Sequence, residues 1–156
     1  MSLSSIVSFL VNKFSYFGVF VASILTSSVI LVPVPSPVVA IGAGVFLNPI
    51  AVGVISGFGA ALGEATGYAL GYSASKKLKK KKNYMKLKKK LKKYENWNFA
   101  FVFISALTPL PDDIMGIYLG TIKYPFWKFL LACALGKITL YTSLALGGKA
   151  ISNVFL

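Results

Sequence analysis

The chain has 156 residues, of which 56% are hydrophobic, and its mean hydropathy is +0.71. A soluble domain of this size could not bury so much apolar surface, so we expect one membrane domain. All seventeen basic residues are lysines, only four residues are acidic, and there is no histidine. This composition excludes histidine-based catalytic triads and histidine-ligated metal sites, and it leaves phosphate recognition to lysines and backbone N–H groups.

Residues 2–32 are predicted to form two N-terminal helices. Apolar residues recur at helical spacing over residues 2–12, which indicates a short helix at the membrane interface. Residues 14–32 are apolar and just long enough to span, since roughly 20 residues cross the hydrocarbon core. Pro33, Pro35 and Pro37 follow, and they end the helix because proline lacks an N–H group and disfavours helical geometry in the residue before it.

Residues 33–75 are predicted to form a hairpin tip, a short returning helix and a full span. The returning helix, residues 38–47, crosses only about half of a ~30 Å core at ~1.5 Å per residue. A break at Asn48-Pro49 starts the long apolar segment 49–75. Small residues every fourth position there predict close packing against a second helix in lipid: Gly59, Gly63, Gly67 and Gly71.

The connector, residues 76–95, holds twelve of the lysines. Tyr84, Leu87, Leu91 and Tyr94 share one helical face, which predicts a basic amphipathic helix lying on the cytoplasmic membrane surface. We expect its lysines to bind anionic lipid headgroups, in particular Lys76, Lys79, Lys82, Lys86, Lys89 and Lys93. A nucleic-acid partner is the rival interpretation, and we disfavour it because the block is short, lacks arginine and joins two membrane segments.

Residues 96–150 are predicted to form a second hairpin and a second span. A half-length helix over 96–107 is interrupted by Pro109 and Pro111, and the sequence resumes at Asp112 and Asp113, which suit the first turn of a new helix. Residues 112–122 return, a break follows at Tyr124-Pro125, and 126–150 span the membrane, with Tyr124 and Trp127 as expected interfacial anchors. Prolines and carboxylates at membrane depth predict a hairpin tip that lines a polar path.

The two halves are related by an offset of 76 residues without a gap. Six residues of the first half match identical residues of the second: Leu31, Pro33, Pro35, Ile41, Gly44 and Pro49 fall on Leu107, Pro109, Pro111, Ile117, Gly120 and Pro125. Each unit contains one full crossing, so the second copy should be inverted relative to the first. The predicted fold is therefore an all-α integral membrane protein, an inverted repeat of two re-entrant helical hairpins, each followed by a transmembrane helix, with amphipathic interfacial helices.

Two charges fall in the middle of the predicted spans, Glu64 in the first and Lys137 in the second. The offset sets Lys137 against Ala61, one turn from Glu64, so both charges should lie at a similar depth. A charge at the bilayer centre costs roughly 2.5–3.5 kcal/mol, so such residues usually pair or line water. Two interpretations stay open: a structural pair that locks the halves together, or a transport site with Lys137 as counter-charge or anion contact.

Asp112 and Asp113 give the second hairpin tip a different chemistry from the first. Adjacent carboxylates in a low dielectric repel one another, so we expect one of them to exchange a proton near neutrality, while the other caps the helix. Ser36 and Pro37 stand at the equivalent places of the first tip, which therefore offers a hydroxyl and backbone dipoles only.

Three stretches carry a family resemblance: VPVPSPVVAIGAGVFLNP, GAALGEATGYALGY and SALTPLPDDIMGIYLGTIKYPFWKF. Together they resemble the DedA family, also called the VTT or SNARE-associated Golgi protein family, over roughly residues 29–148. The resemblance implies two re-entrant hairpins, inverted repeats and movement of polyprenyl-phosphate carriers or phospholipids across the bilayer, linked in bacterial members to the proton-motive force. Bacterial members typically carry an acidic residue where Ser36 stands and an arginine near Asp112 and Asp113, so we expect a divergent branch with another lipid.

We therefore expect a lipid or lipid-phosphate flippase or scramblase in the cell membrane, with Glu64, Asp112 and Asp113 handling protons. The same architecture also permits a transporter of small solutes or ions, or a scaffold that transports nothing. We expect no enzymatic activity and no cofactor, because the sequence offers neither a nucleophile–base pair nor a metal-ligand cluster. Small-residue helix faces permit a homo-oligomer but do not require one.

Overall fold

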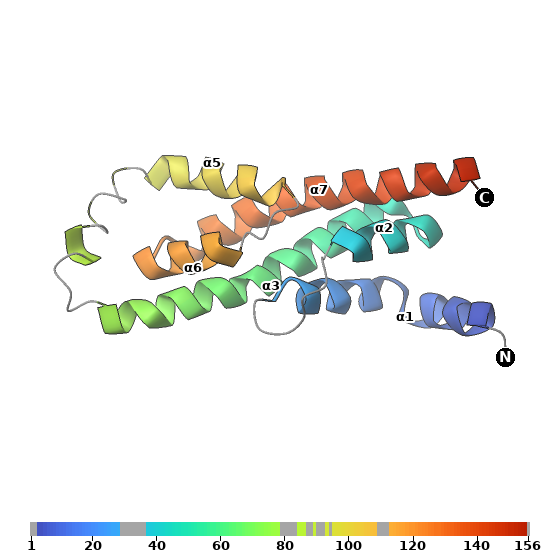
Figure 1. Cartoon of the computed structure of the whole chain (residues 1–156), viewed down its shortest axis with the longest axis horizontal. Coiled ribbons are helices and arrows are strands. Elements are labelled where there is room, and N and C mark those ends of the chain that lie inside the picture. The colour runs from blue at the N-terminus through green and yellow to red at the C-terminus, as the bar shows by residue number, and fades with distance from the viewer. Residues whose placement is uncertain are drawn as a thin grey trace.

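A computed structural model describes residues 3–28, 37–78, 84–86, 89, 93, 95–108 and 113–155, and in these ranges the regular structure is entirely helical. Two 30-residue helices, α3 (Pro49–Leu78) and α7 (Phe126–Phe155), run along the long axis of the molecule in opposite directions and pack on each other (Figure 1). Each contains a window apolar enough to cross a membrane. At ~1.5 Å per residue each helix is about 45 Å long, so it extends beyond a ~30 Å hydrocarbon core or tilts within it.

Four shorter segments flank the long pair. They are the second part of α1 (Leu3–Thr26), α2 (Pro37–Phe46), α5 (Glu95–Ala106) and α6 (Asp113–Ile122). α1 packs on α3 and α5 on α7, whereas α2 packs chiefly on α7 and α6 chiefly on α3. Each short returning helix therefore rests mainly on the long helix of the other half of the chain.

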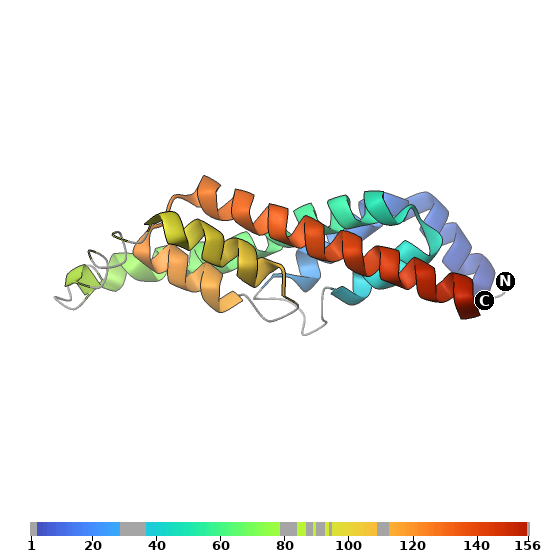
Figure 2. The same cartoon turned by 90° about the horizontal axis from the view of Figure 1, so that it is seen from above.

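The ends of these short helices lie near the middle of the long axis. α1 and α5 approach that point from opposite ends of the molecule, and α2 and α6 lead away from it in opposite directions (Figures 1 and 2). The residues that join each pair, 29–36 and 109–112, lie outside the described residues.

Several predicted boundaries are confirmed to within a few residues. The returning helices expected over 38–47 and 112–122 are found as α2 and α6, and the two spans begin at Pro49 and Phe126 as predicted, although both extend further than expected. The prediction of a continuous span over 14–32 is wrong, because α1 has non-helical torsion angles at Ser15 and ends at Thr26. The apolar segment after Ser15 is therefore too short to cross a membrane, like α5 in the second half.

The connector departs from its prediction at one side chain. Within the described residues its helix covers residues 84–86 and residue 89, so a continuous amphipathic helix stays a prediction. Tyr84, expected to face the membrane surface, is instead 7% exposed, and its hydroxyl donates a hydrogen bond to the Thr121 carbonyl oxygen at 2.7 Å. The connector is thereby attached to the C-terminal end of α6.

The aromatic residues at the start of α7 have different surroundings. Trp127 is 72% exposed, as an interfacial anchor would be, but Tyr124 is 4% exposed and its carbonyl oxygen accepts a hydrogen bond from the Tyr68 hydroxyl. The prediction of Tyr124 as an interfacial anchor is therefore wrong. Lys123, with a φ of 59°, turns the chain between α6 and α7 and lies over the Tyr72 ring at 4.9 Å.

Candidate functional site

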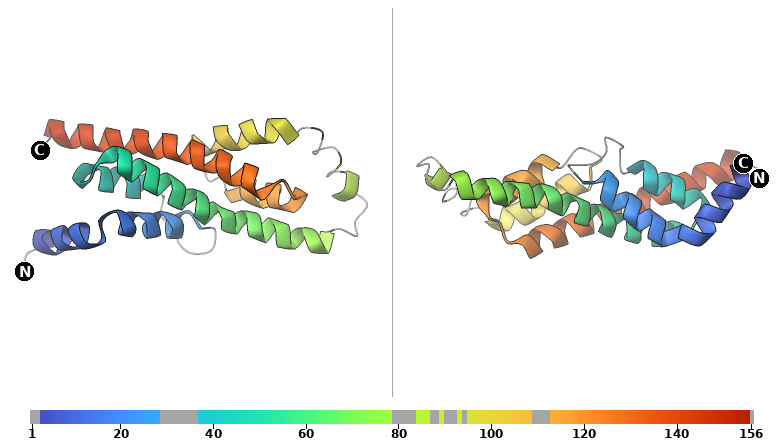
Figure 3. Two further views of the ribbon diagram at one scale, coloured as in Figure 1. Left: turned by 180° about the vertical axis from the view of Figure 1, so that it is seen from behind. Right: turned by 90° about the horizontal axis from the view of Figure 1, so that it is seen from below.

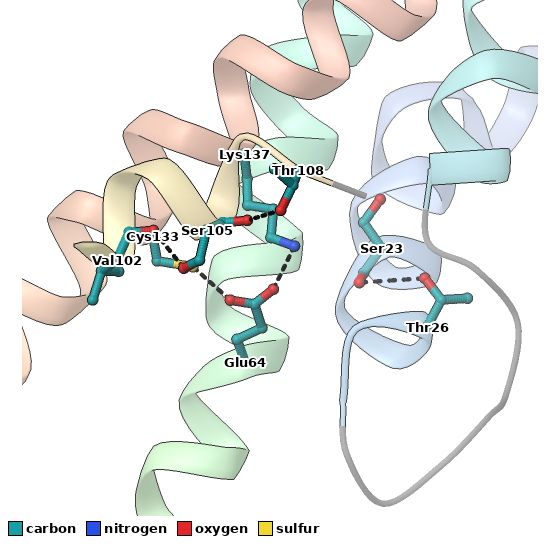
Figure 4. Close-up of polar contacts among 8 residues, drawn as sticks. All are labelled: Ser23, Thr26, Glu64, Val102, Ser105, Thr108, Cys133 and Lys137. Atoms are coloured by element: carbon teal, nitrogen blue, oxygen red, sulfur yellow. Dashed lines mark hydrogen bonds and ion pairs between the residues drawn. The ribbon is translucent and has the colours of Figure 1, made fainter. Parts of the chain in front are cut away.

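An ion pair joins the two long helices near the middle of the molecule. The Lys137 Nζ atom lies 2.6 Å from Glu64 Oε1, and both side chains are about 5% exposed (Figure 4). Glycines permit this close crossing: a Cβ atom on Gly57 would lie 2.5 Å from the Ile138 backbone nitrogen, and Gly53 is in similarly close contact with Thr142. The charges that the sequence placed at a similar depth are thus in direct contact.

The second carboxylate oxygen of Glu64 also has a partner. The Cys133 thiol donates a hydrogen bond to Glu64 Oε2 at 2.7 Å, and the Tyr141 ring centroid lies 5.9 Å from Lys137 Nζ. Cys133, Lys137 and Tyr141 are spaced four residues apart, which puts them on one face of α7. A carboxylate that accepts from both an ammonium and a thiol fits an ionised Glu64 beside a charged Lys137, neutral as a pair.

The short helices reach this pair through glycines next to each charge. On α3, a Cβ atom on Gly63 would lie 2.5 Å from the Ile24 carbonyl oxygen of α1. On α7, a Cβ atom on Gly136 would lie 2.6 Å from the Ala106 Cβ atom of α5. The C-terminal ends of α1 and α5 therefore pack against the residues that directly precede Glu64 and Lys137 in the chain.

Hydroxyl groups follow the last turns of α5. Thr108 Oγ1 donates to the Ser105 carbonyl oxygen at 2.7 Å, and Ser105 Oγ donates to the Val102 carbonyl oxygen at 2.9 Å. Figure 4 shows these side chains in the same view as Glu64 and Lys137.

The predicted hairpin tips fall largely outside the described residues: Pro33, Pro35, Ser36, Pro109, Pro111 and Asp112. Asp113 is described only as the first residue of α6. The expectation that the two aspartates meet Glu64 and Lys137 therefore stays a prediction.

The predicted packing glycines all lie at helix contacts. Gly59 and Gly63 face α1, and Gly71 is in close contact with Ile117 of α6. A Cβ atom on Gly116 would lie 3.6 Å from the Gly67 carbonyl carbon, so Gly67 also faces α6. Of the predicted lipid-binding lysines, Lys76, Lys86, Lys89 and Lys93 are exposed, while Lys79 and Lys82 lie outside the described residues.

Sequence reasoning missed Cys133 as a partner of Glu64. A lone cysteine in an apolar run is usually a packing residue, and Cys133 is indeed fully buried. Its position four residues before Lys137 was the available signal, since any partner of Lys137 had to lie against that face of α7.

A comparison with protein-family models matches the VTT domain over residues 34–150, which is most of the chain and includes α2, α3, α5, α6 and most of α7. The chain belongs to the VTT-domain family. VTT domains of the DedA type occur generally in membrane proteins, and α3 and α7 are long and apolar enough to cross a bilayer. No curated protein and no solved structure matches the chain.

Proposed function

We propose that this VTT-domain protein is a non-enzymatic transporter that moves a lipid or lipid-phosphate headgroup between the two leaflets of the cell membrane. The observation that carries the proposal is the Glu64–Lys137 ion pair, buried between two helices long enough to span a bilayer. Charges at membrane depth are expensive and usually mark a substrate, ion or proton path.

The proposed architecture is an inverted repeat with two re-entrant hairpins. The bounds of α2, Pro37–Phe46, become those of α6, Asp113–Ile122, when 76 is added. The two long helices run in opposite directions, and each returning helix packs mainly on the long helix of the other half (Figure 1). These relations support an arrangement in which the substrate site lies at the interface of the repeats, near the bilayer midplane.

In the proposed mechanism, the headgroup crosses through the hairpin-lined interior while its acyl chains stay in the surrounding lipid. Lys137 and the N-termini of α2 and α6 attract an anionic headgroup, because a helix N-terminus presents unpaired N–H groups and a positive dipole end. Glu64, Asp112 and Asp113 accept and release protons, so that the interior remains close to neutral when the anionic group enters.

The proposed orientation places the lysine connector in the cytoplasm. Both described ends of the chain lie at the end of the molecule opposite to the connector, so they would be extracytoplasmic (Figure 3). Clustered lysines favour the cytoplasmic side and anionic headgroups, and Lys76 and Lys77 extend this charge into the last turn of α3.

A second candidate function is a membrane scaffold that transports nothing. The observation that favours it is the pairing of Glu64, whose two oxygens are engaged by Lys137 and Cys133, as expected for a structural lock. This candidate predicts that apolar replacement of the pair affects stability alone.

Lipid translocation in proteoliposomes separates the candidates. A membrane-impermeant reductant added outside the vesicles quenches the fluorescent phospholipid of the outer leaflet. The fraction of inner-leaflet phospholipid that is quenched afterwards measures transfer between the leaflets. Glu64→Gln and Asp112→Asn/Asp113→Asn should each slow transfer by about tenfold or more, equivalent to about 1.4 kcal/mol of barrier. Thr139→Val is the control, because this exposed side chain bonds to the carbonyl oxygen of Leu135 in its own helix.

Transfer by both carboxylate variants at the parent rate would contradict the proposed site. A parent that moves no lipid but releases an encapsulated solute, or dissipates a pH gradient reported by a trapped dye, would indicate a transporter of small solutes or ions instead.

A further inference from the structure

A row of hydroxyl groups lies between α1 and α3, which run parallel. We call Ser23, Ser27, Ser28 and Thr66 the hydroxyl seam. Glycines of α3 let α1 approach closely: a Cβ atom on Gly59 would lie 3.2 Å from Ser23 Cβ, and one on Gly63 would lie 2.9 Å from Ser27 Cβ. The serine side chains thus point at α3, one turn apart.

Two members of the seam, like Ser56 of α3, differ from most other serine and threonine hydroxyls among the described residues. Elsewhere, serines and threonines mostly donate to a carbonyl oxygen three or four residues earlier in their own helix, as do Thr26, Ser75, Ser105, Thr108, Thr121, Thr139 and Ser143. Ser23 and Ser27, 0% and 8% exposed, have no hydrogen-bond partner within the part of the chain that the structure describes. Buried hydroxyls without partners are costly, so the seam is suited to a ligand that supplies them.

The seam presents oxygen lone pairs. Thr66 Oγ1 donates its hydrogen to the Gly63 carbonyl oxygen at 2.7 Å, so in its 3.2 Å contact with Ser28 Oγ it acts as the acceptor. The Ile24 carbonyl oxygen also faces α3, at Gly63. Because α1 ends at Thr26, the negative end of its dipole lies at the seam.

We propose that the hydroxyl seam binds a dehydrated alkali-metal cation, and that this ion is coupled to lipid movement. Neutral hydroxyl and carbonyl oxygens at the C-terminal end of a half-length helix suit a monovalent ion. A divalent ion would require carboxylates, and an anion would meet the wrong end of the helix dipole. The nearest charges along α3 and α7 are Glu64 and Lys137, which neutralise one another. The coupling rests on the proposed function, whereas binding does not.

Cation binding is tested by the thermal unfolding of the purified full chain in detergent. Cys133 is the only cysteine and is buried, so a thiol-reactive fluorophore reports unfolding directly. NaCl and KCl are compared with choline chloride at equal ionic strength. A bound ion should raise the unfolding temperature saturably by roughly 2–6 °C, with one alkali cation more effective than the other.

Ser27→Ala/Thr66→Val should abolish the cation-specific shift, because two of the proposed ligand oxygens are lost. Thr139→Val/Ser143→Ala is the matched control: it removes two hydroxyls that bond within α7 and should keep the shift. If the seam hydroxyls are merely unsatisfied or hydrated by water, NaCl, KCl and choline chloride will shift the parent equally. That result, or retention of the shift in the seam variant, would overturn the proposal.

The translocation assay separates this inference from the proposed function. A cation-specific shift without lipid movement would leave the site standing and remove the transport function. Lipid movement at the same rate in alkali-metal and choline buffers, together with no cation-specific shift, would remove the site and leave the function.

Discussion

At the scale of single residues, the Glu64–Lys137 pair joins two chain segments that are 73 positions apart in sequence. Desolvating two charges offsets much of their attraction, so a buried pair adds little stability compared with an apolar pair of similar size. Removing one partner has a different effect, because the remaining charge is then buried without its counter-charge. Neutrality of the pair is therefore the property that the fold requires.

We predict that Glu64→Gln and Lys137→Met will each destabilise the protein by about 3–5 kcal/mol, while the double variant will lose less than either single variant. Unfolding followed through the reactivity of Cys133 measures all three variants. Destabilisation of the double variant equal to the sum of the two single effects would show that the side chains act independently.

The sequence placed both charges at one depth, because the repeat offset and the helical period suffice for that inference. It did not predict the Cys133 thiol as a donor to Glu64, since this contact depends on how α7 is rotated against α3. Nor did it predict that the hydroxyls of Ser23 and Ser27 would lack a hydrogen-bond partner among the described residues, because serine in a membrane helix usually bonds to its own backbone.

At the scale of helices, boundaries were predictable where proline sets them. α2 begins at Pro37 and α3 at Pro49, because proline is favoured at the first position of a helix, where its missing N–H group is not needed. The end of α1 at Thr26 was not predicted, because the polar run Thr26-Ser27-Ser28 is short and the apolar residues 29–32 follow it, so the pattern favours a helix that extends to the first proline. The prediction for Tyr124 was wrong because it used only the general preference of tyrosine for the membrane interface. In the structure, the turn between α6 and α7 buries this side chain.

Two glycines of α2 provide a matched test of helix packing. A Cβ atom on Gly44 would lie 2.6 Å from the Ala145 carbonyl oxygen of α7, whereas one on Gly42 would have no described atom within 4 Å. Gly44→Ala should therefore push α2 away from α7 and destabilise the protein by about 1–3 kcal/mol. Gly42→Ala should be neutral or slightly stabilising, because alanine favours the helix. Equal unfolding temperatures for the two variants would contradict the packing described for α2.

At the scale of the whole molecule, the two halves have helices in the same order and at matching positions, but they differ in chemistry. The first half contributes Glu64 and the hydroxyl seam, and the second contributes Cys133 and Lys137. The sequence predicted this order of helices because prolines at matching positions determine where helices end, and glycines at matching positions determine where two helices approach closely. Which side of the membrane each break faces follows only from the proposed inverted arrangement.

Labelling of single cysteines from either side of sealed membranes tests that arrangement most directly. The background variant is Cys133→Ser, which keeps a hydrogen-bond donor to Glu64. Four proteins each carry a single cysteine at one boundary of a proposed hairpin, at residue 16 or 48 for the first hairpin and at residue 93 or 123 for the second. Our account predicts that a membrane-impermeant thiol reagent labels Lys93→Cys and Lys123→Cys from the cytoplasm, and Tyr16→Cys and Asn48→Cys from the opposite side. Labelling of Lys93→Cys and Lys123→Cys from opposite sides would mean that α5 and α6 together cross the membrane, and it would contradict the account.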